Sequence, residues 1–152
     1  MNKAGFAPTV QKHYLDSMKV LDRPASVFGA GAATNLFTVV RGYILLVCLT
    51  GRVVVQIAAG ANTMTLHAPG AVALDDGAVS INAMAVGTNL VTPGNVAVVT
   101  SVVAAAAIAV ALPWDCVVGN FTCTCTAATT PGTIRFSLAY IPCTEDTIVI
   151  VA

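Results

Sequence analysis

The chain has 152 residues, enough for one domain with a single hydrophobic core. Hydrophobic residues make up 57% of it and charged residues only 9%, whereas about a quarter of an ordinary soluble domain is charged. The formal net charge is zero and no run of Lys or Arg occurs, which argues against nucleic acid as a partner. So few charges cannot coat a monomer, and we expect apolar surface to be buried against other chains or against a membrane.

Residues 1–35 are interpreted as an N-terminal arm, because their composition differs from that of the rest of the chain. Four of the seven basic residues lie in it: Lys3, Lys12, Lys19 and Arg23. Thr9 is a suitable N-cap for a short helix over Val10–Val20, and Pro24 would stop that helix. No apolar region of a signal peptide is expected here. The arm is either a frayed terminus or a segment that reaches a neighbouring subunit.

The stretch Leu36–Ile57 is the clearest β-signal in the sequence. Val, Ile, Thr, Phe and Tyr dominate it, and these side chains fit a pleated sheet. Three strands are expected, separated by tight turns at Arg41-Gly42 and Thr50-Gly51, because glycine tolerates the positive φ of short hairpins. Tyr43–Leu49 is apolar on both faces, so it belongs in the middle of a sandwich or barrel, or at a subunit interface.

The middle of the chain predicts shorter strands. Thr63–His67 alternates apolar and polar residues, as a half-exposed strand does. Asp75-Asp76-Gly77 is a strong turn signal and predicts a hairpin between Val72–Leu74 and Val79–Val86.

The uncharged stretch Val96–Leu112 approaches the length of a membrane span. A turn-like Thr92–Asn95 precedes it and no basic cluster flanks it, so two buried strands are expected here in preference to a span.

The C-terminal third has the most regular alternation. Phe121, Cys123 and Cys125 share one face of a strand. Ile134–Tyr140 alternates in the same way after a turn at Thr130-Pro131-Gly132, and Thr147–Val151 is a last apolar strand. About eight to ten short strands without a long amphipathic helix predict an all-β fold, an antiparallel sandwich or barrel over residues 36–152.

Candidate chemical sites are few. The five cysteines lack paired metal-ligand spacing and are expected to be reduced thiols that pack as small apolar residues: Cys48, Cys116, Cys123, Cys125 and Cys143. The only histidines, His13 and His67, belong to no catalytic motif. Asp75 and Asp76 are explained by a turn. We therefore expect no catalytic residue, no metal and no cofactor.

Two blocks of sequence, taken together, resemble a group of tailed-bacteriophage virion proteins. The first is LFTVVRGYILLVCLTGRVVVQI followed by ANTMTLHA, and the second is the closing GTIRFSLAYIPCTEDTIVIVA. In that group a similar meander precedes an Asn-Thr-x-x-Leu strand, and the chain ends on a Gly-[ST]-[IV]-[KR]-[FW]-x-[LV]-x-Tyr-[IV]-Pro strand. The resemblance covers the body after Leu36. It implies a small β-rich component of a phage particle, such as a capsid decoration (cement) protein, and no catalytic residues.

The expected function is therefore structural: a non-enzymatic decoration protein of the virion, made in the host cytoplasm, that packs between coat subunits. Its expected partners are copies of itself, as a trimer, and the major capsid protein or other virion proteins. One alternative is a fibre-base or host-recognition module that binds carbohydrate, and another is a small membrane-associated protein. The expected interface residues are Tyr14, Leu15, Met18, Phe28 and Trp114.

Overall fold

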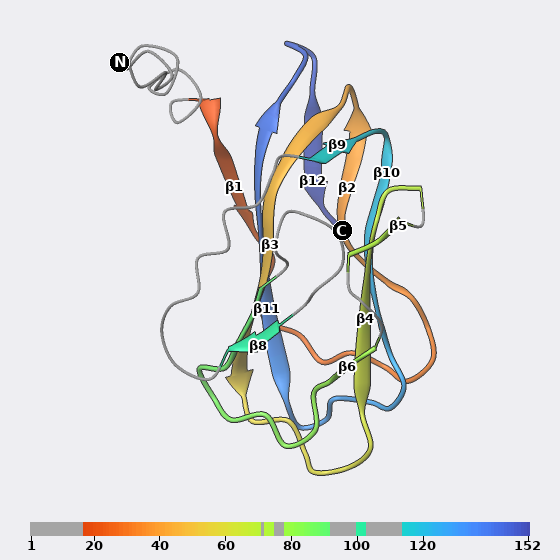
Figure 1. Ribbon diagram of the computed structural model, residues 1–152, viewed down its shortest axis with the longest axis vertical. Helices are drawn as coiled ribbons and strands as arrows, with labels where there is room; N and C mark the ends of the chain where they lie inside the picture. Colours follow the sequence, from red (N-terminus) through yellow and green to blue (C-terminus); the bar gives the residue numbers. More distant parts are fainter. Residues whose placement is uncertain (1–16, 71, 75–77, 92–99, 103–113) are drawn as a thin grey trace, which may run out of the picture.

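Figure 1 shows a computed structural model of the protein, which describes residues 17–70, 72–74, 78–91, 100–102 and 114–152. Within these ranges the chain forms twelve strands and no helix, and so contains no helix able to span a membrane. The strands are β1 (Lys19–Asp22), β2 (Thr34–Arg41), β3 (Ile44–Val55), β4 (Thr63–Ala68), β5 (Val72–Ala73), β6 (Val79–Ser80), β7 (Asn89–Val91), β8 (Thr100–Val102), β9 (Trp114–Cys116), β10 (Gly119–Cys125), β11 (Thr133–Pro142) and β12 (Ile148–Val151).

The strands form two antiparallel sheets, which face each other in Figure 1. In sheet A the order is β1-β11-β3-β7-β8, and β9 also pairs with β3. In sheet B the order is β12-β2-β10-β4-β5, and β6 also pairs with β4. The all-β class and the antiparallel pairing predicted from the sequence are confirmed.

One hydrophobic core lies between the sheets and is built from alternate residues of the long strands. On β11, Ile134, Phe136 and Leu138 are fully buried, whereas Arg135 between them is exposed. Phe121, Cys123 and Cys125 of β10 are buried in the same way. Burial of a large apolar side chain contributes about 1.5–3 kcal/mol. The alternation predicted for the C-terminal third is confirmed.

The turn expected at Thr50-Gly51 is absent, because β3 runs through it as a single strand of twelve residues. Gly51 pairs with Phe136 of β11 on one side and with Leu90 of β7 on the other. A Cβ on Gly51 would lie 2.8 Å from a ring carbon of Phe136. The prediction was wrong because glycine in a strand can permit close packing as well as a turn.

The turn at Arg41-Gly42 is confirmed, since Gly42 has a φ of 73° and separates β2 from β3. Gly42 packs against the turn between β11 and β12. A Cβ on Gly42 would lie 2.5 Å from Thr144 Oγ1 and 2.7 Å from Thr147 Oγ1. These two turns therefore form one compact end of the molecule.

Residues 19–22 and 34–35, expected to belong to the arm, are part of the two sheets. β1 pairs with β11, with Lys19 opposite Tyr140 and Asp22 opposite Ser137. Residues 19 and 20, expected to end the helix over Val10–Val20, therefore lie in a strand, and residues 10–16 of that expected helix are outside the described part. Helical periodicity and a short edge strand cannot be distinguished over so few residues.

Residues 23–31, here called the crossing segment, lead from sheet A to sheet B. Ser26 forms a bridge with Ile134 of sheet A, and Ala30 forms one with Cys125 of sheet B. Between them, Phe28 is only 1% exposed, and its ring packs edge-on against Phe136 with the centroids 5.6 Å apart. The crossing segment therefore closes one side of the core.

The hairpin expected between Val72–Leu74 and Val79–Val86 is also wrong in the described residues. β5 pairs with one end of β4, where Val72 lies opposite Ala68, and β6 pairs with the other end, where Val79 lies opposite Met64. β5 and β6 therefore pair with different ends of β4 and do not pair with each other.

Candidate interaction surfaces

The five expected interface residues do not form one surface in the described part of the chain. Tyr14 and Leu15 lie outside it. Met18, just before β1, is 39% exposed and available for contact. Phe28 belongs to this chain's own core, which corrects its expected role as a contact on another subunit. Trp114 pairs through its backbone with Leu46 in sheet A, and its side chain is not described.

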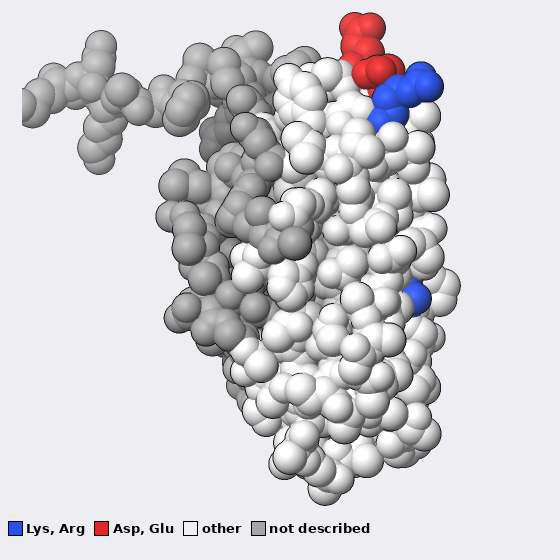
Figure 2. Space-filling model, turned by 90° about the vertical axis from the view of Figure 1, so that its right-hand side faces the viewer, with Lys and Arg blue, Asp and Glu red and all other residues white. Residues whose placement is uncertain are grey.

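The outer face of sheet B is broad and carries almost no charge. Among its described strand residues, Arg41 at the end of β2 is the single Lys, Arg, Asp or Glu. Figure 2 views the molecule from the side on which sheet B lies in Figure 1, and charged side chains gather mainly at one end of an otherwise uncharged surface. Most outward residues of the central strands are small and polar: Asn35, Thr38, Thr63, Thr65, Asn120, Thr122 and Thr124, with His67 of β4 and Val40 of β2 beside them.

Neighbouring strands align these polar side chains in rows across sheet B. Thr38 lies opposite Asn120, and its hydroxyl donates to Asn120 Oδ1 at 2.8 Å. Thr124 lies opposite Thr65, and the hydroxyls of Thr63 and Thr126 are 3.2 Å apart. These contacts hold short side chains close to the sheet, so the face offers hydrogen-bonding groups that need little ordering when a partner binds.

Apolar residues border this face at its β2–β12 edge. Val40, Ile148 and Ile150 are 47%, 45% and 48% exposed. Large aliphatic side chains next to uncharged polar ones, with charges depleted, are typical of the core of a protein–protein interface. The alternation of threonines in TMT and TCTCT placed them on one face of each strand, but only the sheet order shows that the two motifs lie side by side.

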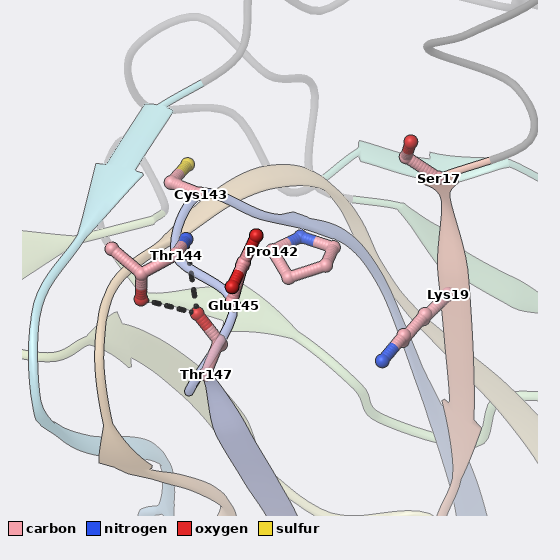
Figure 3. Close-up of a pocket in the computed structure, with 7 residues that line it drawn as sticks. All are labelled: Ser17, Lys19, Pro142, Cys143, Thr144, Glu145 and Thr147. Atoms are coloured by element: carbon pink, nitrogen blue, oxygen red, sulfur yellow. Dashed lines mark hydrogen bonds between the residues drawn. The ribbon is translucent and has the colours of Figure 1, made fainter.

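A shallow pocket of about 420 Å³ lies at the end of the molecule where β11 turns into β12 (Figure 3). Its walls come from that turn and from β1, and its lining residues are Ser17, Lys19, Pro142, Cys143, Thr144, Glu145 and Thr147. Thr144 Oγ1 and Thr147 Oγ1 are 2.8 Å apart, and Thr147 Oγ1 also donates to the carbonyl of Tyr43 at 3.3 Å. These bonds fix the turn.

A second hollow, of about 210 Å³, lies on the outer face of sheet A. Arg52 of β3 and Arg135 of β11 are direct cross-strand partners, and both line it together with Val54 and Val86. Like charges placed directly opposite each other on a sheet are destabilising. No acidic side chain forms an ion pair with either arginine within the described ranges, so this pair is a candidate contact for an anionic group.

Three of the five cysteines, Cys116, Cys123 and Cys125, are buried in the core as expected, whereas Cys48 and Cys143 are partly exposed. Cys123 and Cys125 are each 1% exposed, with their sulfur atoms 4.0 Å apart. Their hydrogen bond lowers the pKa of Cys125 below the ordinary thiol value, while burial acts in the opposite direction. Burial raises the pKa of Cys48. No group of three potential metal ligands occurs among the described residues.

The histidine and aspartate candidates form no site in the described part of the chain. His67 is half-buried on β4 and lies opposite Thr122. His13, Asp75 and Asp76 lie outside the described residues.

No protein-family model, curated protein or solved structure matches this chain.

Proposed function

We propose that this protein is a non-enzymatic structural component of a bacteriophage particle, a decoration protein that packs between coat subunits and stabilises the shell. In this proposal the two sheets form a β-sandwich, and the protein acts as a homo-oligomer, a trimer, in the virion. The observation that carries the proposal is the outer face of sheet B, which has six described strands and Arg41 as its single charged strand residue.

A broad uncharged face is costly for a protein that stays alone in solution, because charged groups keep surfaces apart and soluble. The same face suits a permanent contact, because no charge has to be desolvated when a partner covers it. The rows that include Thr38, Asn120 and Thr124 can exchange hydrogen bonds with a partner, and Ile148 and Ile150 supply apolar area. We therefore assign this face to the contact with the capsid shell.

The test is binding to capsids assembled without this protein. The wild-type protein should sediment with them at a fixed stoichiometry and raise the temperature at which they break open. A variant with two new charges in the middle of the face, Asn120→Glu with Thr124→Glu, should stay folded by circular dichroism. Its binding should weaken at least about tenfold, because a carboxylate buried without a partner costs several kcal/mol.

The matched control places two glutamates on exposed valines away from this face, Val20→Glu with Val27→Glu, which are 57% and 47% exposed. This control should bind like the wild type. Failure of the wild-type protein to bind capsids would refute the decoration role, and binding to a glycan array in its place would support the host-recognition module.

A further inference from the structure

The hollow between Arg52 and Arg135 holds two positive charges on a surface with few charges of any kind. The two residues are directly paired on neighbouring strands, which places their Cβ atoms about 4.5–5.5 Å apart. Both side chains are exposed, and Asn89 of β7 lies opposite Arg52 on its other side. Asp22 of β1 lies opposite Ser137 and accepts a hydrogen bond from its hydroxyl, and within the described residues it forms no ion pair with either arginine. The arginine pair is therefore available to a carboxylate supplied from outside the chain.

The same chain presents two adjacent carboxylates on a rigid turn. Glu145 and Asp146 are exposed between β11 and β12. The turn is held by the hydrogen bond from the Thr147 amide to the Thr144 carbonyl, 3.2 Å, and by the contact between the Thr144 and Thr147 hydroxyls. Because the backbone is already fixed, these carboxylates lose little conformational freedom when they bind a partner.

The two charged groups of one chain cannot reach each other. They lie toward opposite ends of β11, and the strand from Arg135 to Pro142 alone spans about 23 Å. Lys19 lines the same pocket as Glu145 but comes from β1 (Figure 3), and within the described residues it forms no ion pair with the turn. A second copy of the chain carries both a carboxylate pair for the arginines and an arginine pair for the carboxylates.

We infer that copies of this protein associate head to tail, with the Glu145-Asp146 turn of one copy inserted between Arg52 and Arg135 of the next. The hollow of about 210 Å³ has room for a carboxylate side chain, and Val54 and Val86, 38% and 64% exposed, supply apolar contact around it. A contact between two different patches is heterologous, and it produces a closed ring when the rotation between copies closes. A trimer is such a ring, so the inference rests on the self-association in the proposed function and names its contact.

The experiment is a charge swap read by sedimentation equilibrium of the full chain. Reversing the arginines (R52E with R135E) or the acids (E145R with D146R) places like charges together and should weaken self-association at least about tenfold. The chain with all four substitutions restores every pair with reversed polarity and should recover the wild-type mass. High salt should weaken the association of the wild type and of the fourfold variant.

The control, V20E with V27E, adds two carboxylates at exposed positions outside both charged groups and should leave the mass unchanged. Circular dichroism establishes that each variant is folded. If the wild type is an oligomer and both charge-reversal variants keep the same mass, this contact is overturned while the proposed function stays intact. So would a fourfold variant that stays dissociated. A monomeric wild type that still binds capsids would also overturn the inference, whereas loss of capsid binding alone bears on the proposed function.

Discussion

Gly51 of β3 and Phe136 of β11 lie opposite each other in sheet A, and the phenyl ring occupies the space that a side chain at position 51 would need. The ring is fully buried and also packs edge-on against Phe28 of the crossing segment. Because Gly51 has no side chain, the Phe136 ring can contact both β3 and the crossing segment.

Substitution of Gly51 by Ala should destabilise the protein by about 1–3 kcal/mol, because the new Cβ would lie 2.8 Å from a ring carbon of Phe136 in a tightly packed core. Urea unfolding followed by circular dichroism measures this change. Gly29→Ala is the control, since a Cβ there would have no atom within 4 Å, and it should be close to neutral. Equal stability of the two variants would show that the ring moves aside freely.

Phe28→Ala should cost about 3–5 kcal/mol, the usual range for removing a buried phenylalanine. The residue next to it, Val27, is 47% exposed, and Val27→Ala should change the free energy of unfolding by about 0.5 kcal/mol or less. Thermal unfolding of the two variants under one set of conditions makes the comparison. A small effect at position 28 would mean that the crossing segment does not close the core in solution.

Truncation at the N-terminus should show a sharp boundary. A chain that begins at residue 17 keeps β1 and Phe28 and should unfold cooperatively, whereas one that begins at residue 29 loses both and should be largely unfolded at room temperature. The chemical-shift dispersion of the proton NMR spectrum and circular dichroism distinguish these outcomes. A well-folded chain from residue 29 would place the fold boundary nearer to residue 36.

Thr129→Val should destabilise the protein by about 1–3 kcal/mol although it preserves the shape of the side chain. The buried hydroxyl of Thr129 accepts a hydrogen bond from the Phe28 amide and donates one to the Gly132 carbonyl, each at 2.9 Å. The valine variant leaves these buried backbone groups without that partner. Thr124→Val on the outer face of sheet B serves as the control and should change stability by less than about 0.5 kcal/mol.

Stability should fall at alkaline pH. Burial raises the pKa of the Cys48 thiol and of the Tyr140 phenol above their ordinary values of 9.0 and 10.0, so the folded protein holds these protons more tightly than the unfolded chain. The stabilisation is complete below the ordinary values and is lost as the pH rises through the folded pKa values. Urea unfolding between neutral pH and about pH 10.5 should show the decline, and Tyr140→Phe should reduce its upper part. An unchanged slope in this variant would contradict the assignment to Tyr140.

The regular strands could be predicted because their side chains alternate with a period of two. The buried sets on β4, β10 and β11 follow directly from that pattern. The role of Gly51 could not be predicted, since its sequence context fits a turn and a close contact equally well. Phe28 looked like an exposed anchor because small residues surround it, and only its long-range contacts with Thr129 and Phe136 place it in the core.

The candidate surfaces depend even more on long-range pairing. Arg52 and Arg135 are far apart in the sequence, and nothing near either one indicates that they are cross-strand partners. The threonine rows of sheet B likewise require β10 to lie between β2 and β4.

The pairing of β1 with β11 and the hydrogen bond from the Ala152 amide to the Leu36 carbonyl join early and late parts of the sequence. β1 is synthesised long before its partner strand β11, and β2 long before its partner β12, so both sheets wait for the last strands of the sequence. The fold therefore depends on contacts between residues that are far apart in the sequence, and such contacts slow folding.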